Sequence, residues 1–362
     1  MKKYKLINTL SGWAVFVVAA VVYLLTIEPT ASFWDCGEFI SSAYKLEVGH
    51  PPGAPIFMLL GNLFTQFTND PGQVAKMVNS MSALLSAFTI LFLFWTITHL
   101  TRKLVMGEKN EAFNPGQTIA VIGSGLVGAL VYTFSDTFWF SAVEGEVYAF
   151  SSMLTALVFW LILKWEENAE KPDSDKWIVL IAYIMGLSIG VHLLNLLCIP
   201  AIVMVYYYKK TGNPTWKGGI VSLLLSFGLI LVLMYGIIPG FTKVGGWFEL
   251  FFVNTLGMPY NSGVAVYLVL LVASIVWALF ESLSDKGDLK RARIAFLLSI
   301  GLSGILFIGG SIWLWLVLIG TALYFVFSKN KLNVKFLNLS MSSLLVILIG
   351  FSAYAIIPIR SS

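Results

Sequence analysis

The chain has 362 residues, of which 58% are hydrophobic, 15% aromatic and 12% charged. Soluble domains carry about 25% charged residues. A soluble chain of this length could not bury so many apolar side chains in a single hydrophobic core. The composition excludes a soluble globular enzyme, a disordered protein and a disulfide-stapled secreted domain. Apolar runs of about 20 residues predict an all-α polytopic membrane protein, because the strands of membrane barrels alternate instead.

Eleven membrane spans are predicted from the hydropathy of the sequence. The first runs from about Leu10 to Ile27 and follows a basic start; it is longer than the core of a signal peptide, so we expect a retained helix. The other ten are 76–100, 118–135, 146–164, 177–191, 193–208, 218–238, 264–280, 293–308, 311–328 and 337–357. Together they predict a single transmembrane domain over residues 1–362.

The distribution of basic residues predicts the orientation. With the N-terminus in the cytoplasm, all of the 23 Lys and Arg residues except Lys45, Lys76, Lys243 and Arg360 lie on the inner side. Acidic residues divide almost evenly, as the positive-inside rule allows. The net charge of +4 therefore reflects topology and does not indicate a nucleic-acid partner. The C-terminus is expected outside.

The predicted outer face carries three connections, over residues 28–75, 136–146 and 239–263. In the first outer loop, residues 36–47 have the spacing of a short amphipathic surface helix, which Gly49 and the two prolines at 51–52 should end. A second apolar segment, 54–68, is short for a span and is expected to be another surface helix.

Asp35 and Glu38 open the first of these surface helices. Being three residues apart, they project to one side of the first turn. One interpretation is that Asp35 caps the helix and Glu38 completes a capping box. The other is that one carboxylate is a general base at the membrane surface, where an apolar neighbourhood raises its proton affinity. Both can hold together.

Several motifs resemble those of the GT-C superfamily of membrane glycosyltransferases, in particular its protein O-mannosyltransferase-like branch found in Bacteroidetes and in animals. They are Trp-Asp-x-Gly-Glu at 34–38, His-Pro-Pro-Gly at 50–53, Val-Asn-Ser-x-Ser-Ala-Leu at 78–84, Phe-Trp-Phe-Ser-Ala-Val-Glu-Gly-Glu-Val-Tyr at 138–148, and Gly-Val-His-Leu-Leu-Asn at 190–195. The resemblance covers roughly residues 20–200.

This resemblance implies a GT-C type helix bundle that transfers a sugar, with mannose the family-level expectation, from a polyprenyl-phosphate carrier to a protein Ser or Thr hydroxyl or a glycan. An acidic residue of the first outer loop acts as the base, here Asp35, with Glu38 second. The location implied is a bacterial inner membrane, with the site facing the periplasm. The soluble outer C-terminal domain frequent in the family is expected to be absent from this chain. No Asp-x-Asp metal motif of the oligosaccharyltransferase type is found in the predicted outer loops, so no metal or other cofactor is expected.

Other candidate binding residues lie at predicted outer helix ends. Glu144 and Glu146 either form a solvated turn or orient the acceptor or carrier, with Tyr148 close to Glu146. His192 and Asn195 could bond a phosphate or sugar hydroxyl, or serve packing. A further histidine, His50, is expected to shape the loop, with a direct role in the site as the alternative.

Cations for the carrier phosphate are scarce on the predicted outer face. Lys243 lies in an aromatic segment that could hold a lipid or simply form an aromatic belt, and Arg360 closes the last span. Cys36 and Cys198 and the three histidines form no metal-binding spacing.

Two other functions compete with the glycosyltransferase. A secondary transporter or lipid flippase would place ionisable groups near the bilayer midplane, often in repeated halves. Here span centres such as 81–95 and 122–131 hold no charge, and acidic residues gather at the outer ends. A non-catalytic scaffold would tolerate Asp35→Asn.

Overall fold

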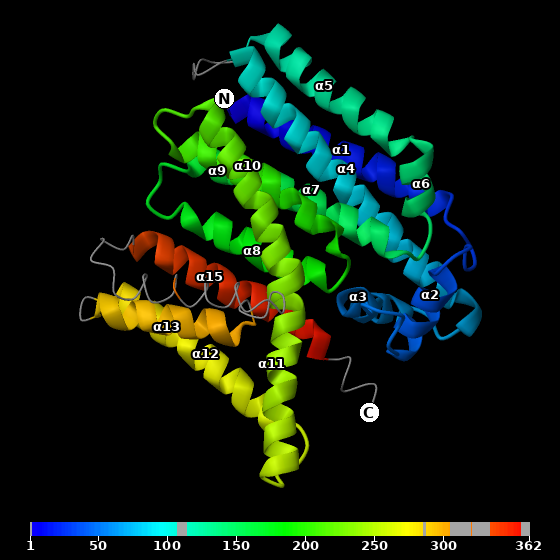
Figure 1. Cartoon of the computed structure of the whole chain (residues 1–362). Coiled ribbons are helices and arrows are strands. Elements are labelled where there is room, and N and C mark those ends of the chain that lie inside the picture. Colours follow the sequence, from blue (N-terminus) through cyan, green and yellow to red (C-terminus); the bar gives the residue numbers. More distant parts are fainter. Residues whose placement is uncertain (1, 107–113, 285–286, 305–319, 321–333, 356–362) are drawn as a thin grey trace. The chain divides into compact units, whose positions relative to one another are not determined.

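The computed structural model describes residues 2–106, 114–284, 287–304, 320 and 334–355 (Figure 1). All regular elements in these ranges are helical, which confirms an all-α polytopic membrane protein. The chain divides into two compact units, Met1–Val205 with Ile347–Ser362, and Tyr206–Val346. That residues 1–362 make a single transmembrane domain stays a prediction.

The first unit contains the N-terminal half of the chain. Its elements are α1 (Lys2–Leu25), α2 (Cys36–Lys45), α3 (Pro55–Thr65), the 3₁₀ turn η1 (Pro71–Gln73), α4 (Val74–Met106), α5 (Pro115–Thr133), α6 (Asp136–Ala142), α7 (Val147–Asn168), α8 (Asp175–Ile189), the 3₁₀ segment η2 (Leu193–Cys198) and the start of α9 (Ile199–Lys210). The end of α15 (Val334–Phe351) and η6 (Ser352–Ala355) also belong to it.

Helix α4 is the centre of this unit, because α1, α5 and α7 all pack against it (Figure 1). Ile90, Leu91 and Phe94 are essentially inaccessible to solvent. A helix that is apolar around its whole circumference is one that neighbours cover on several sides. Small residues such as Ala83 and Ala87 allow close packing at these contacts.

Polar contacts fix the ends of the helices. The buried Tyr23 hydroxyl of α1 donates a hydrogen bond of 2.9 Å to the carbonyl oxygen of Thr133, the last residue of α5. Helix α5 begins with a capping box of Asn114 and Gln117. A Cβ atom at Gly186 of α8 would lie 2.5 Å from the carbonyl oxygen of Ile347, so only glycine permits this approach of α8 to the end of α15.

The second unit is built on α12, which packs against α11 and α13. Its elements are the end of α9, α10 (Trp216–Leu231), the π-helical turn η3 (Val232–Ile237), α11 (Ile238–Leu250), the π-helical turn η4 (Phe251–Thr255), α12 (Ser262–Leu283), α13 (Leu289–Leu302) and most of α15. The Tyr267 hydroxyl donates to the Leu302 carbonyl oxygen at 2.7 Å, and this bond ties α12 to the end of α13.

The prediction of a loop over 239–263 is wrong for most of its length. Residues 216–255 are helical without a break, and only 256–261 lie between this helical run and α12. Pro239 lacks an N–H and would clash with the preceding turn of a regular α-helix. The wider π turn immediately before α11 accommodates it, so the helix continues.

Eight helical runs of the described chain are long and apolar enough to cross a membrane, compared with about eleven predicted. Predicted span 177–191 corresponds to α8, which is only 15 residues long, and 293–308 overlaps α13, which has 14. The predicted span 311–328 lies outside the described residues apart from position 320.

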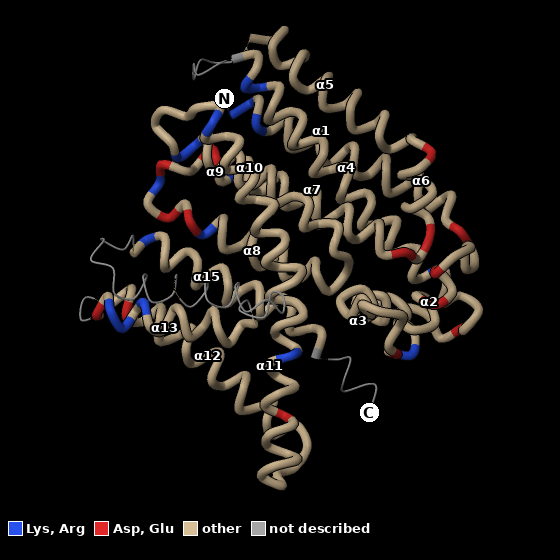
Figure 2. Tube along the Cα trace, in the orientation of Figure 1, with Lys and Arg blue, Asp and Glu red and all other residues tan. Residues whose placement is uncertain are grey.

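Charges separate along the helices of the first unit (Figure 2). Lysines and arginines gather at the end where α1 begins, whereas the opposite end, with α2 and α6, carries mainly acidic residues. We call these the basic end and the acidic end.

Candidate active site at the acidic end

Helix α2 presents the central residues of the site. Its Phe39 and Ala43 side chains are buried, whereas Glu38 is exposed, as the amphipathic spacing predicts. The helix ends at Leu46, which adopts a left-handed conformation with φ of 53°. The predicted stop at Gly49 is therefore three residues late. Helix α3 follows where the second surface helix was predicted.

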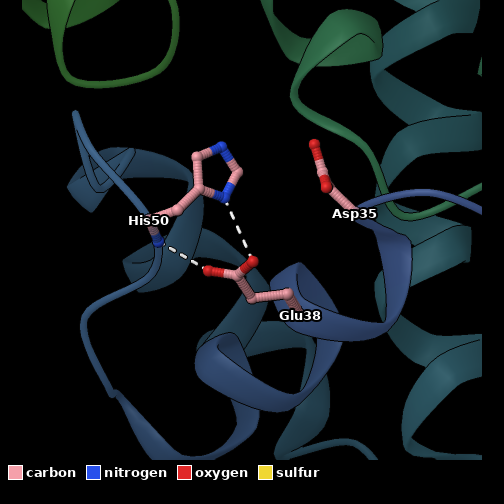
Figure 3. A group of neighbouring side chains, drawn as sticks. All are labelled: Asp35, Glu38 and His50. Carbon is pink, nitrogen blue, oxygen red and sulfur yellow. Dashed lines mark hydrogen bonds and ion pairs between the residues drawn. The ribbon is translucent and has the colours of Figure 1, made fainter.

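The carboxylate of Glu38 is held by His50. The backbone N–H of His50 donates to Oε1 at 2.5 Å, and Nδ1 lies 3.1 Å from Oε2 (Figure 3). These bonds lower the pKa of Glu38, and its carboxylate in turn raises the pKa of His50. The histidine ring also packs on Phe39, with ring centroids 5.6 Å apart. His50 thus holds the Glu38 carboxylate in place within the loop.

Asp35 lies beside this pair at the start of α2. Its side chain makes no capping hydrogen bond, so the capping-box interpretation is wrong: Glu38, its supposed partner, bonds His50 instead. Within the described part of the chain, the Asp35 carboxylate has no hydrogen-bond partner and is exposed. Ligand atoms of all three residues lie within 4.8 Å of one another. They could hold a divalent cation, although two of the three are already bonded to each other.

The segment after His50 joins α2 to a distant part of the unit. It contains a cis Pro51–Pro52 bond, and Gly53 has φ of 90°. The backbone N–H of Ile56 then donates to the Gly190 carbonyl oxygen at 2.8 Å. The Gly-Val-His segment after α8 is therefore attached to the same loop that carries Glu38.

A buried asparagine fixes the beginning of the loop. The Asn79 side chain of α4 is fully buried, and its Nδ2 donates to the carbonyl oxygens of Glu28 at 2.7 Å and Thr30 at 3.0 Å. The Glu28 backbone N–H also bonds the Val143 carbonyl oxygen at 3.2 Å. Residues 28–30 are thus held between α4 and the turn before α7.

That turn places two carboxylates in the interior. Glu144 and Glu146 are only 6% and 5% exposed, so the interpretation as a solvated turn is wrong. The Cys36 Sγ atom lies 3.7 Å from Glu146 Oε1. Burial, together with the nearby Glu144 and Asp35 charges, raises the pKa of Glu146 to about 7. Burial also raises the pKa values of Glu144 and of the Cys36 thiol.

A second polar group lies at the start of α7. Tyr148 is half-exposed and contacts the His192 ring, with centroids 5.5 Å apart. The His192 Nδ1 atom accepts a hydrogen bond from the Leu194 N–H at 3.1 Å, which leaves the proton of the neutral ring on Nε2. Burial lowers its pKa and favours this neutral form. Asn195 is fully buried; its Oδ1 accepts from Thr155, and its Nδ2 has no partner in the described residues.

A cavity of about 640 Å³ begins beneath this group. Leu194 and Leu197 line one side of it, and Ser152, Thr155 and Phe159 line another. The last three lie on one face of α7 with Tyr148, because their spacing is that of a helix. Thr89, Leu93, Thr96, Tyr132, Ala156 and Cys198 complete the lining. The cavity is largely apolar and follows the helix away from the acidic end.

Two predicted binding residues are not among the described residues of the first unit. Lys243 lies in α11 of the second unit, where its ammonium group is 5.6 Å from the centroid of the Trp247 ring. Arg360 lies outside the described residues.

Sequence reasoning gave no role to Cys36 or Asn79. Cys36 was considered only as a disulfide or metal-ligand residue, and it forms neither pattern. Asn79 is a polar residue inside an apolar run of the sequence. This position could have identified it, because an amide side chain inside a membrane span needs hydrogen-bond partners. The partners are backbone carbonyls about 50 residues away in sequence.

The family model of the protein O-mannosyl-transferase TMEM260 N-terminal domain matches residues 35–215. The chain belongs to this family. It is 30% identical over 230 residues to the protein O-mannosyl-transferase TMEM260 of Mus musculus, a match that covers 62% of this chain and 29% of that protein. The corresponding Dictyostelium discoideum protein is 25% identical over 226 residues, which cover 59% and 25% respectively.

These matches confirm the resemblance to O-mannosyltransferase-like membrane proteins. The matched region covers less than a third of the length of either relative. No solved structure matches the chain. The family match begins at Asp35 and includes Glu38, His50, the Glu144–Glu146 turn and His192.

Proposed function

We propose that this chain is a membrane glycosyltransferase. It moves a mannose-like sugar from a polyprenyl-phosphate carrier to a protein Ser or Thr hydroxyl, at the acidic end of the bundle. The observation that carries this proposal is the free Asp35 carboxylate next to the fixed Glu38–His50 pair, at the point where the family match begins. The names of the relatives support the reaction class and the acceptor class.

Asp35 is the general base. It is exposed and has no hydrogen bond to give up, whereas the Glu38 oxygens already accept from His50. The acceptor oxygen bonds to the sugar C1 while its proton passes to Asp35. The bond between C1 and the phosphate oxygen breaks at the same time, and the lipid phosphate leaves with the electron pair. Attack opposite the leaving group inverts C1. A positioned base contributes about 10²–10⁴-fold in rate.

The polyprenyl chain lies in the apolar cavity beside α7. Its volume of about 640 Å³ is in the range of ligand-binding cavities. Ser152 and Phe159, which line the cavity, follow Val147, the first residue of α7, by 5 and 12 residues. At a rise of 1.5 Å per residue, the side of the cavity formed by α7 therefore extends from about 8 to 18 Å from the start of the helix. That is the depth of one leaflet of a hydrocarbon core about 30 Å thick.

The carrier phosphate lies above the cavity, next to His192. Its Nε2–H can donate to a phosphate oxygen, because Nδ1 is occupied by the Leu194 N–H. Tyr148 flanks the same position. Glu146 is protonated for part of the time near neutral pH, so it can donate a hydrogen bond to an oxygen of the sugar or acceptor.

The acidic end faces the outside of the cell, and the membrane is a bacterial inner membrane. The orientation is supported by the asymmetry of Lys and Arg along the sequence, which favours a cytoplasmic basic end. A cysteine placed at exposed position 70 or 173 and labelled by a membrane-impermeant maleimide would test this orientation. Labelling at 70 and not at 173 in intact cells supports it, and the reverse pattern contradicts it.

The reaction is tested with membranes that contain the full chain, a radiolabelled polyprenyl-phosphate mannose and a Ser/Thr-containing acceptor. We expect Asp35→Asn to lower the transfer rate by about 10²-fold or more. Asp70→Asn is the matched control, because it makes the same change in the same connection, at an exposed residue that caps η1. Equal rates for Asp35→Asn and the control would contradict the assignment of the base. Absence of transfer from every polyprenyl-phosphate sugar would contradict the proposed reaction.

A further inference from the structure

A second cavity lies at the opposite end of the same unit. Its volume is about 600 Å³, and it is formed by α1, α4 and α7. Arg102 follows the loop anchor Asn79 by 23 residues along α4, which corresponds to about 35 Å. Lys164 follows Val147 by 17 residues, or about 26 Å, along α7. The cavity is therefore about one membrane thickness from Asp35.

The cavity is positively charged. Lys5, Arg102 and Lys164 line it from three different helices, and Glu167 is the one acidic residue in its lining. Glu167 pairs with both Arg102 and Lys164, at 3.3 Å for the latter. Three cations against one carboxylate leave an excess of two positive charges. Such an excess in a pocket between helices favours an anionic ligand.

Two buried polar atoms of the lining lack hydrogen-bond partners in the described structure. One is Nε2 of His99, a residue only 7% exposed; its Nδ1 atom lies 3.4 Å from Glu167, whereas Nε2 makes no hydrogen bond and lies 3.8 Å from Glu166. The buried Oδ1 atom of Asn8 also lacks a donor. Buried groups of this kind cost free energy unless something bonds them. A ligand with both an anionic group and a hydroxyl would satisfy them.

Aromatic rings form the remaining wall. Trp95 and Trp160 have ring centroids 5.4 Å apart, and both line the cavity. Tryptophans at the ends of membrane spans lie at the depth of lipid headgroups. The cavity thus combines cationic residues with indole rings at the depth of lipid headgroups. This combination matches the phosphate and glycerol region of a lipid better than a free anion, because a free anion has no apolar part to pack on the rings.

We propose that this cavity binds the headgroup of an anionic glycerophospholipid such as phosphatidylglycerol. The phosphate diester lies between Lys5 and Arg102, and a headgroup hydroxyl donates to the Asn8 Oδ1 atom. The glycerol backbone packs on the Trp95–Trp160 pair. This site is separate from the proposed transfer reaction, and it does not depend on it.

The test is a lipid titration of the purified full chain in detergent, followed by thermal unfolding and by native mass spectrometry. Phosphatidylglycerol should raise the unfolding temperature and remain bound, whereas phosphatidylcholine and inorganic phosphate should do neither. Each surface cation contributes about 1 kcal/mol to binding an anionic lipid, so Lys5→Gln should weaken phosphatidylglycerol binding about fivefold. Lys3→Gln, a change on the same helix at a residue outside the cavity lining, is the control.

Lys5 is the first choice because it is exposed and makes no ion pair within the described part of the chain, so its replacement should not disturb folding. Asn8→Leu is the second variant: it removes the unpaired oxygen and should weaken phosphatidylglycerol more than a lipid that lacks headgroup hydroxyls, such as phosphatidic acid. Equal effects of phosphatidylglycerol and phosphatidylcholine would overturn the proposal. So would equal losses for Lys5→Gln and Lys3→Gln, or displacement of the lipid by inorganic phosphate, which would assign the cavity to a free anion.

Discussion

The buried Glu146 should make the stability of this protein depend on pH in an unusual direction. Its carboxyl group is 5% exposed and lies near Glu144 and the Cys36 sulfur. The folded-state pKa of about 7 exceeds the ordinary value of 4.5. Between these two values the folded state binds more protons than the unfolded state, so stability falls as pH rises. Paired surface carboxylates have the opposite effect.

The magnitude follows from the two pKa values. At 1.36 kcal/mol per pKa unit, the difference corresponds to about 3 kcal/mol lost between pH 4 and pH 8. Glu146→Gln keeps the size of the side chain and removes its titration. We therefore expect the variant to lose most of this dependence and to be more stable than the wild type at pH 8. A smaller slope should remain, since burial also raises the pKa of Glu144.

The assay is unfolding of the purified chain in a non-ionic detergent at a series of pH values from 4 to 8. The matched control is Glu47→Gln, at an exposed residue of the same connection whose nearest cation, Lys45 Nζ, is 4.0 Å away. The control should follow the wild type at every pH. Parallel curves for the wild type and Glu146→Gln would refute the inference that Glu146 is protonated through burial.

Three further predictions concern the same end of the molecule. A methyl group at Gly145 would come within 2.9 Å of two buried side chains, so Gly145→Ala should lower the free energy of unfolding by about 1–3 kcal/mol. Gly123→Ala is the control: the space around Gly123 is open, so this variant should lower the unfolding temperature by much less. The His50 ring should titrate above 6.5 by NMR, because Glu38 stabilises its charged form, and Glu38→Gln should return the pKa towards 6.5; an unchanged value would contradict the pairing. Transfer should survive a chelator, since the Glu38 and His50 groups already satisfy each other; loss of activity that Mn²⁺ or Mg²⁺ restores would instead identify the three-residue cluster as a metal site.

Hydropathy and helical spacing were sufficient to predict most helices. The eight long runs agree with eight predicted spans, and the amphipathic spacing after Asp35 correctly indicates α2. The break predicted at Gly190 lies between α8 and η2. These features depend on local composition and periodicity, which the sequence contains directly.

The failures have a different physical origin. Residues 239–263 contain proline and several glycines among aromatic residues, a composition typical of loops. A π turn before Pro239 nevertheless keeps the helix continuous. The capping box failed because His50, twelve residues away, competes for Glu38. Glu144 and Glu146 look like a solvated turn from their neighbours in sequence, but tertiary contacts bury them.

The position of Asp35 is itself set by contacts that no local pattern contains. Asn79 holds residues 28–30, the Ile56 N–H attaches the loop to Gly190, and Cys36 packs against Glu146. Each contact joins the first connection to a different helix end. A free carboxylate on an exposed loop would ordinarily sample many positions; three such attachments restrict it. The family match extends from residue 35 to 215 and so includes all three partner positions, Asn79, Glu146 and Gly190. The three partner residues therefore lie within the region that the chain shares with its family.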